Sequence, residues 1–449
     1  MNDRNNSLSK GIDITILWLY LALVAIGWIA IFSVEYRPGD NVVQKILSFN
    51  TNYAKQLFFI GLSLIMGVFV LLTDSKFFTA TANLFYAFGI VTLLLVFPFH
   101  SHIKGTNSII KLGAFNFQPA EICKLFVSLA LAKYLSRLET NFTKTNAHLV
   151  AFALTLIPAV LAILQNETGL ALVYFSFFIV MYREGLPAWY LVLGFSLIIL
   201  VVATLLVDKY ILAGLLSAIA VFIIYLLYSR FRRYRKYSFL VIGIWFIAVA
   251  VQLFAVPYVF ESGKVFKGYQ VKRIYAAIGK DYIPKDAEQL KEIQEKEKGK
   301  KKDEGDYNVK QSKIAIGSGG LLGKGFLKGL QTQGDFVPEQ HTDFIFTAWA
   351  ESFGFWGSAL LIGIYLFLIL RIVNIAERQR STFSRVYAYS VASIIFFHVM
   401  VNICMTVGLA PVIGIPLPML SYGGSSLLTF TILLFILLRL DADRQMVLR

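Results

Sequence analysis

Three ionisable side chains, Glu339, His341 and Asp343, lie within residues 337–346 (VPEQHTDFIF), where a long polar segment meets an apolar helix. An ionisable group at the boundary between water and lipid is costly and is retained mainly for a function. From the residues alone, Asp343 is either the N-cap of the following helix or a functional acid. His341 is either a hydrogen-bonded surface residue or a catalytic one. This cluster is the first candidate for chemistry.

Two further acids lie in polar segments between apolar runs. Glu121 and Lys124, in residues 113–124 (GAFNFQPAEICK), are three positions apart and therefore share one face of a helix. They form either a structural ion pair or part of a site. Glu167, in the turn LQNETG, is either a turn or helix N-terminal acid or a reactive group.

Glycine and proline mark two more segments. Residues 311–326 (QSKIAIGSGGLLGKGF) carry Lys313 among glycines that allow tight turns. This segment lacks the Walker pattern and follows no strand, which argues against a nucleotide site. Residues 414–426 (GIPLPMLSYGGSS), which include Ser421, interrupt helix at membrane depth. Such backbone must line a cavity or be buried in protein.

Composition indicates an integral membrane protein. Of the 449 residues, 57% are hydrophobic and 15% are charged, whereas soluble domains average about 25% charged residues. The net charge of +15 is explained by cytoplasmic loops and anionic membrane lipids, so no nucleic-acid partner is predicted. The first apolar run lacks a cleavage site after it and is read as a membrane span.

The predicted fold is all-α, a polytopic membrane helix bundle that forms a single domain over residues 1–449. Unbroken apolar runs of about 20 residues favour helices over a β-barrel. About twelve spans are predicted, at 13–34, 56–73, 78–98, 119–136, 147–165, 169–182, 187–207, 210–228, 238–257, 344–370, 386–410 and 424–440.

Lysine and arginine concentrate in alternate short loops, which places both termini in the cytoplasm. Residues 258–343 then form one long extracytoplasmic loop, and a loop of that length escapes the charge rule. Within it, residues 284–306 hold seven lysines against eight acids. This nearly neutral insertion predicts either a solvated helix or a disordered polyampholyte.

Read together, five segments resemble the SEDS family (shape, elongation, division and sporulation). The wording QSKIAIGSGG resembles the elongation branch, the RodA type, more than the division branch, FtsW. The segments are IDITILWLYLALVAIGWIAIFS, FQPAEICKLFVSLALAKYL, QSKIAIGSGGLLGKGFLKGLQTQ, FVPEQHTDFIF with AESFGFWG after it, and VNICMTVGLAPVIGIPLPMLSYGGSSLL.

The resemblance implies a peptidoglycan glycosyltransferase that polymerises lipid II at the outer face of the cytoplasmic membrane. A class B penicillin-binding protein and other elongation-complex proteins are its implied partners. The essential aspartate of the family falls on Asp343, and its acid and lysine fall on Glu121 and Lys124. The predicted substrate-binding residues are Glu121, Lys124, Lys313, Glu339, His341 and Ser421.

In such a reaction a sugar hydroxyl needs a base, for which Asp343 is the candidate. The departing pyrophosphate needs positive charge, which Lys124, Lys313 or a bound Mg²⁺ or Mn²⁺ would supply. A lipid II flippase, a division-type polymerase and a non-catalytic scaffold are the alternatives.

The sequence departs from the family pattern at four places. Ser108-Ile109 replaces the usual Arg-Trp, and Gln165-Asn166-Glu167 replaces the usual QPD. The charged segment of the long loop is inserted, and the helix pair around 187–228 is extra to the family's ten spans. The first change puts a substrate contact at position 108 in doubt.

Overall fold

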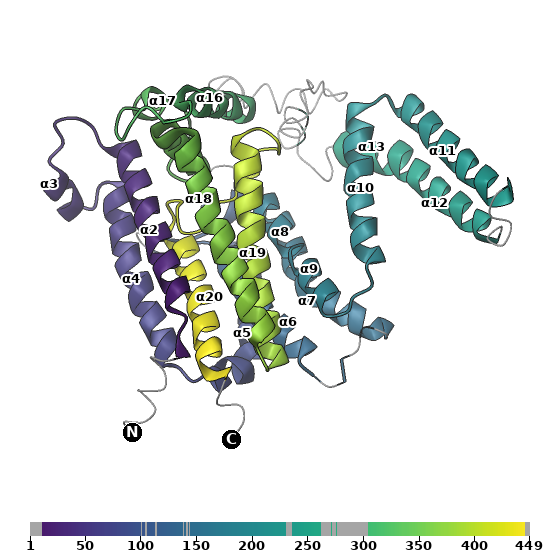
Figure 1. The fold of residues 1–449 in the computed structure, drawn as a ribbon, viewed down its shortest axis with the longest axis horizontal. Helices are drawn as coiled ribbons and strands as arrows, with labels where there is room; N and C mark the ends of the chain where they lie inside the picture. The colour runs from purple at the N-terminus through teal and green to yellow at the C-terminus, as the bar shows by residue number, and fades with distance from the viewer. Residues whose placement is uncertain are drawn as a thin grey trace. The chain divides into compact units, whose positions relative to one another are not determined.

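The computed structural model (Figure 1) describes residues 11–99, 101–103, 106–112, 115–137, 139–140, 142, 144–229, 236–261, 271, 275 and 304–444. The chain divides into two compact units. Unit 1 comprises Met1–Pro187 and Asn308–Arg449, and unit 2 comprises Ala188–Tyr307. The single domain over residues 1–449 stays a prediction.

Helical backbone lies at each of the twelve predicted spans. Among the described residues, ten helices are long and apolar enough to cross a membrane, and the predicted span 169–182 coincides with the shorter apolar helix Thr168–Arg183. The chain is therefore an integral membrane protein. The predicted span 119–136 coincides with α6 (Pro119–Leu135), which has 17 residues, and the count of twelve spans stays a prediction. In unit 1 the spans correspond to α2 (Ile14–Glu35), α4 (Asn52–Leu72), α5 (Ser75–Phe99), α6 (Pro119–Leu135), α7 (Thr145–Leu164), α8 (Thr168–Tyr174) with α9 (Phe177–Arg183), α18 (Ile345–Arg378), α19 (Thr382–Thr406) and α20 (Gly424–Ala442).

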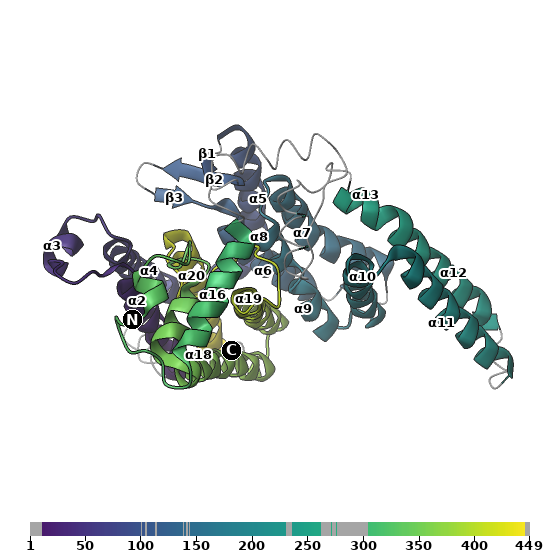
Figure 2. The ribbon, with the colours of Figure 1, turned by 90° about the horizontal axis from the view of Figure 1, so that it is seen from above.

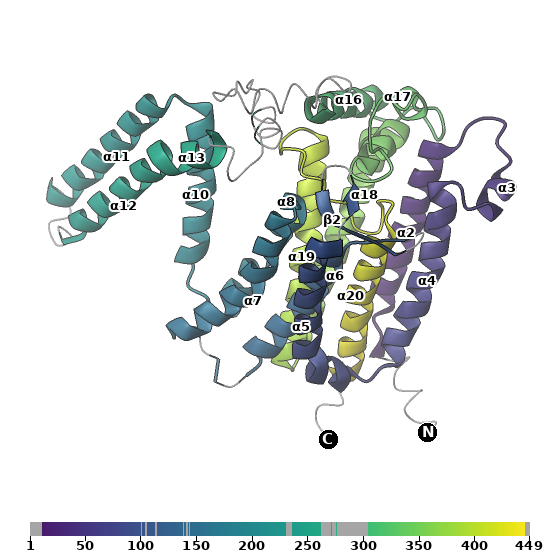
Figure 3. The ribbon, with the colours of Figure 1, turned by 180° about the vertical axis from the view of Figure 1, so that it is seen from behind.

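The centre of unit 1 is built on α19 and α20. In their spanning windows 67% and 83% of residues are buried, against 22% in both α4 and α5. Helix α6 packs against α5, α7, α19 and α20, and Figure 3 shows α5, α6 and α7 on one side of the bundle. The outer helices expose apolar side chains, as expected of surfaces that lipid covers.

The two ends of unit 1 differ in structure. Helix α2 begins and α20 ends at one end, whereas α16 (Glu304–Gly319) and α17 (Leu330–Gln333) lie at the other (Figure 1). Seen from above, α16 lies across the ends of α18 and α19 (Figure 2). The predicted long loop 258–343 thus contains ordered helix on both sides of its insertion. Residues 284–303 of that insertion lie outside the described residues.

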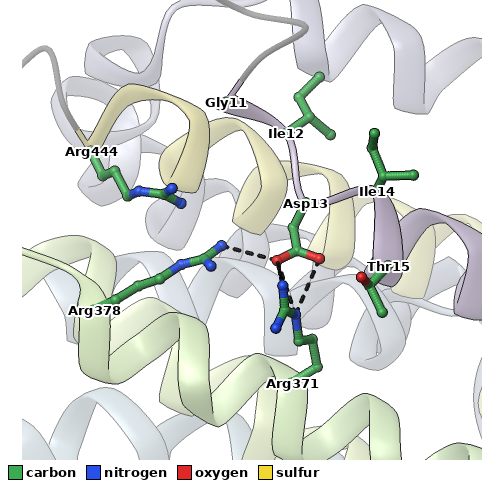
Figure 4. A pocket seen from close by; sticks show the side chains of 8 residues that line it. All are labelled: Gly11, Ile12, Asp13, Ile14, Thr15, Arg371, Arg378 and Arg444. Atoms are coloured by element: carbon green, nitrogen blue, oxygen red, sulfur yellow. Dashed lines mark hydrogen bonds and ion pairs between the residues drawn. The ribbon is translucent and has the colours of Figure 1, made fainter.

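Ion pairs connect α2 to α18 where α2 begins. Asp13, the N-cap of α2, accepts a hydrogen bond from the Ile16 N–H (3.3 Å) and pairs with Arg371 (2.7 Å) and Arg378 (3.0 Å). Together with Arg444 these groups line a shallow pocket (Figure 4). Burial acts to raise the pKa of the Asp13 carboxyl, but the hydrogen bonds and charges of these partners hold it below its ordinary value.

A small antiparallel sheet precedes α6 and was not predicted. Its strands β1 (Ser101–Ile103), β2 (Thr106–Leu112) and β3 (Phe115–Phe117) pair in the order β1-β2-β3. Ile110 pairs with Phe117 and Leu112 with Phe115, so β2 and β3 are antiparallel neighbours. The sheet leads the chain directly into Gln118, the N-cap of α6.

Unit 2 holds the extra helix pair as α10 (Trp189–Leu206) and α11 (Lys209–Ser229). They are followed by α12 (Ser238–Ala250), the π-helical turn η2 (Val251–Ala255) and α13 (Val256–Glu261). The Trp245 indole N–H donates to Ser217 (3.1 Å) and thereby ties α12 to α11. A small apolar core contains Leu205, Val256, Phe260 and Val271.

Candidate functional site

Residues 407–423, the interrupted segment between α19 and α20, are buried or half-buried in protein apart from the exposed Leu409, in keeping with the prediction for broken backbone. Side chains of α18 and α19 form hydrogen bonds with three of its carbonyl groups, those of Ile415, Pro416 and Pro418. The Tyr365 hydroxyl donates to the Pro418 carbonyl. Inside the segment, the Ser421 hydroxyl accepts a hydrogen bond from the Leu417 N–H (2.8 Å). Such partners are required because a buried unpaired carbonyl is costly.

This segment holds the residues around Asp343 by their backbone. The Ser421 hydroxyl donates to the Thr342 carbonyl (2.7 Å), and the Tyr422 N–H donates to the His341 carbonyl (2.8 Å). The Ser421 side chain is buried and forms hydrogen bonds with backbone on both sides, so it holds the two segments together. A substrate contact at Ser421 stays a prediction. The two segments meet in space although about 80 residues separate them in the sequence.

Asp343 is not the N-cap of α18. That helix begins at Ile345 and its N-cap is Phe344. The Asp343 side chain is partly exposed, and one carboxylate oxygen, Oδ2, faces Gly414: a Cβ there would lie 3.3 Å from it. Because glycine has no side chain, space is left beside the Asp343 carboxylate. Any larger residue at position 414 would fill part of that space.

Glu339 and His341 lie beside Asp343. The backbone of Glu339 has a φ of 55°, a left-handed conformation that is rare outside glycine. Its carbonyl accepts the Phe344 N–H (3.2 Å), which closes a tight turn. The His341 ring lies 5.9 Å from the ring of Tyr422. Burial, and to a smaller extent the charge of Glu35, raises the pKa of Tyr422, so its phenol stays protonated.

Glu121 and Lys124 form a buried ion pair on α6. Each is 1% exposed, and the Lys124 ammonium donates to Oε2 of Glu121. The ammonium also lies 3.0 Å from Nε2 of His398 and 4.4 Å from the centroid of the Phe430 ring. In this conformation Lys124 contacts protein groups, so a substrate contact at Lys124 stays a prediction.

Lys313 is exposed on α16. Its side chain passes over Gly408, where a Cβ would collide with its terminal atoms. Among the described residues Lys313 has no acidic partner. Helix α16 is fixed by the buried Ser312, whose hydroxyl shares a hydrogen bond with the Thr347 hydroxyl (2.6 Å) and donates to the Thr406 carbonyl (2.8 Å).

The glycine-rich segment after α16 docks into a break in α18. At Gly354 the backbone leaves the helical conformation with a φ of 64°, which frees four backbone groups. The glycines bring the two backbones close enough to pair. The bonds are Lys324 N–H to Glu351 O (3.0 Å), Gly325 N–H to Ser352 O (3.0 Å), Phe355 N–H to Gly320 O (2.9 Å) and Trp356 N–H to Leu321 O (3.2 Å).

Glu351 is an organising residue that the sequence analysis did not single out. Its carboxylate is buried on α18 and pairs with Lys324 (3.0 Å). It also accepts hydrogen bonds from the Gln331 N–H (3.0 Å), the Thr332 N–H (2.9 Å) and the Thr332 hydroxyl (2.6 Å). An acid within the apolar part of a membrane helix is itself a signal, and that signal was available in AESFGFWG.

Glu167 contacts the sheet instead of capping a helix. It occupies the N-cap position of α8, but its side chain makes no capping bond. Its carboxylate accepts hydrogen bonds from the Ser108 hydroxyl and from Nε2 of Gln118 (3.1 Å). Ser108, one of the two residues at which the sequence departs from the pattern that the resemblance implies, is buried and bonded to this acid.

No three His, Cys, Asp or Glu side chains gather into a metal-binding group within the part of the chain that the structure describes. The described acids and histidines therefore do not by themselves provide a complete ligand shell for a divalent ion. They fit such an ion only when oxygens of the substrate supply the remaining ligands.

Two curated relatives align over nearly their whole length. The peptidoglycan glycosyltransferase MrdB of Escherichia coli (strain K12) is 29% identical over 436 residues, covering 97% of this chain and 95% of the relative. The peptidoglycan glycosyltransferase RodA of Treponema pallidum (strain Nichols) is 29% identical over 453 residues, covering 96% and 97%.

Solved structures share the fold. The crystal structure of the Thermus thermophilus rod shape determining protein RodA has a TM-score of 0.59 at 22% identity, covering 96% of this chain and 97% of that one. A chain from a structure described as "Structural coordination of polymerization and crosslinking by a peptidoglycan synthase complex" has a TM-score of 0.64 at 22% identity, covering 96% and 98%.

The model of the family described as "Cell cycle protein", with the members FtsW, RodA and SpoVE, matches residues 14–240 and 218–446. Because these two matches together span nearly the whole chain, the chain belongs to this family, the SEDS family.

Proposed function

We propose that this protein is a peptidoglycan glycosyltransferase that polymerises lipid II at the outer face of the cytoplasmic membrane during cell elongation. The observation that carries the proposal is the Asp343 carboxylate, which lies outside the helix cap and faces Gly414. Full-length relatives named as peptidoglycan glycosyltransferases support the same reaction.

The reaction joins the 4-hydroxyl oxygen of one lipid-linked disaccharide to the anomeric carbon of another. The bond from that carbon to polyprenyl pyrophosphate breaks, and the pyrophosphate leaves with the bonding electrons. Asp343 accepts the hydroxyl proton, as a general base does. One base suffices for a single inverting displacement, because the leaving group is already activated.

Positive charge stabilises the departing pyrophosphate. Lys313 is the better placed of the two predicted lysines, since it is exposed and without an acidic partner among the described residues, whereas Lys124 is buried against Glu121. A Mg²⁺ or Mn²⁺ ion, when bound, would supply further charge. It would be held chiefly by substrate oxygens, with Asp343 or Glu339 as a protein ligand.

The proposed partner is a class B penicillin-binding protein, which cross-links the strands, together with other elongation-complex proteins. The structural neighbour that couples polymerization and crosslinking in a peptidoglycan synthase complex supports a transpeptidase partner. Membrane lipids cover the outer helices, and the positive charge of the chain favours anionic headgroups.

The test is polymerisation of labelled lipid II by the purified protein with its transpeptidase partner, with and without a metal chelator. Asp343→Asn keeps the shape of the side chain and removes the base, so turnover should fall about 10²–10⁴-fold. The matched control is Asp335→Asn, because Asp335 is an exposed acid of the same segment that pairs with Arg37 (2.7 Å).

Wild-type turnover by Asp343→Asn would rule out the base. Transbilayer movement of lipid II without polymer would instead favour a flippase, and loss of activity in Asp335→Asn would show that any acid change in this segment is harmful. A loss of turnover on chelation that added metal restores would show that an ion takes part.

A further inference from the structure

Two polar side chains on α19, His398 and Asn402, are fully buried and have no part in the reaction as described. They lie four residues apart and therefore on one face of the helix, one turn from each other. Each contacts a backbone carbonyl of the interrupted segment, and the two carbonyls are consecutive: Ile415 and Pro416. One face of α19 therefore holds two adjacent peptide units of the interrupted segment through hydrogen bonds.

The proton of His398 can be placed from its partners. Nε2 lies 3.0 Å from the Lys124 ammonium, which donates and cannot accept. Nε2 must therefore accept, which leaves the proton on Nδ1. Nδ1 lies 3.1 Å from the Pro416 carbonyl and donates to it. His398 is accordingly a neutral link between the ion pair on α6 and the interrupted segment.

Asn402 links the same segment to Asp343. Its Nδ2 donates both of its hydrogens, one to the Ile415 carbonyl (2.7 Å) and one to the Asp343 carbonyl (2.8 Å). Both acceptors are carbonyl oxygens, so the amide must present nitrogen to them. One side chain, that of Asn402, therefore holds the backbone of Asp343 close to the backbone of Ile415.

We propose that His398 and Asn402 are positioning residues that hold the Asp343 carboxylate in place where it faces Gly414. The inference rests on the proposed role of Asp343 as base. Gly414, which the carboxylate faces, directly precedes the two clamped peptide units. A shift of this segment would displace the base, and a displacement of about 1 Å can reduce a rate by about 10²-fold.

The test compares Asn402→Leu with wild type in the lipid II assay. The leucine is similar in size but donates no hydrogen bond, so kcat should fall about 10²-fold while the KM for lipid II stays within about threefold. Because the substitution changes the surroundings of the Asp343 carboxylate, the pH at which kcat falls on the acidic limb of the pH–kcat profile should also shift. A purely structural role would lower the yield of folded protein and leave that limb in place.

The matched control is Thr406→Val, which removes a buried polar group on the same face of α19, one turn further on. Within the described part of the chain, the Thr406 hydroxyl bonds only inside its own helix, to the Ile403 carbonyl (2.9 Å), so wild-type kinetics are expected.

Where Asn402→Leu does not fold, His398 carries the test. His398→Asn keeps a donor near the Nδ1 position toward Pro416, whereas His398→Gln keeps only an acceptor near Nε2, so the asparagine variant should be the more active. The reverse order of activities, or wild-type kcat in Asn402→Leu, would overturn the positioning role of His398 and Asn402 while the proposed function stands. Absence of polymer with the wild type would overturn the function itself.

Discussion

Replacing Glu351 by glutamine should release the glycine-rich segment from α18. Oε1 of Glu351 accepts three hydrogen bonds, the one from the Ser318 hydroxyl being long (3.5 Å), and Oε2 accepts two. In glutamine one oxygen becomes an amide that donates, so at least two bonds are lost and the others lose their charge assistance. A hydrogen bond to a charged group contributes about 1.5–3 kcal/mol, so local stability should fall by about 3 kcal/mol.

Hydrogen exchange followed by mass spectrometry measures this directly in detergent. A loss of about 3 kcal/mol corresponds to about 10²-fold faster exchange at the amides that Glu351 anchors, Gln331 and Thr332. The matched control is Glu377→Gln on the same helix, since Glu377 is half exposed and pairs with Arg183 at the surface. Unchanged exchange at both amides in Glu351→Gln would refute the reasoning.

Two other changes test the ion pairs. Asp13→Asn should lower the melting temperature at neutral pH by several degrees, because two arginines lose their buried partner. The pKa of Asp13 is depressed, so its stabilisation is complete above its ordinary pKa of 3.8 and is lost as pH falls through the lower folded value; the difference in melting temperature should therefore shrink toward pH 3. Glu121→Gln should reduce lipid II turnover by misplacing Lys124, and unchanged turnover in that assay would leave the pair a purely structural role.

Hydropathy located the spans because insertion into lipid depends on each segment by itself. The boundaries of α11, expected at 210–228 and found at Lys209–Ser229, show how local this signal is. Asp343, which is partly exposed, could be selected for the same reason, because an ionisable group next to Phe-Ile-Phe is unusual however the helices pack. The short sheet before α6 was missed because two of its strands are only three residues long, too short for an alternating pattern of apolar and polar residues to be recognised.

Only the tertiary structure decided what each polar residue contacts. Nothing in the sequence joins Asn402 to Asp343, or Ser421 to Thr342, because those bonds form only when α18, α19 and the interrupted segment pack together. The glycines of residues 317–325 allow many turns, and the break at Gly354 selects the one that pairs their backbone. Hydrogen bonds between distant segments depend on which surfaces meet in the folded chain, whereas the preference of a segment for lipid is determined by its own side chains.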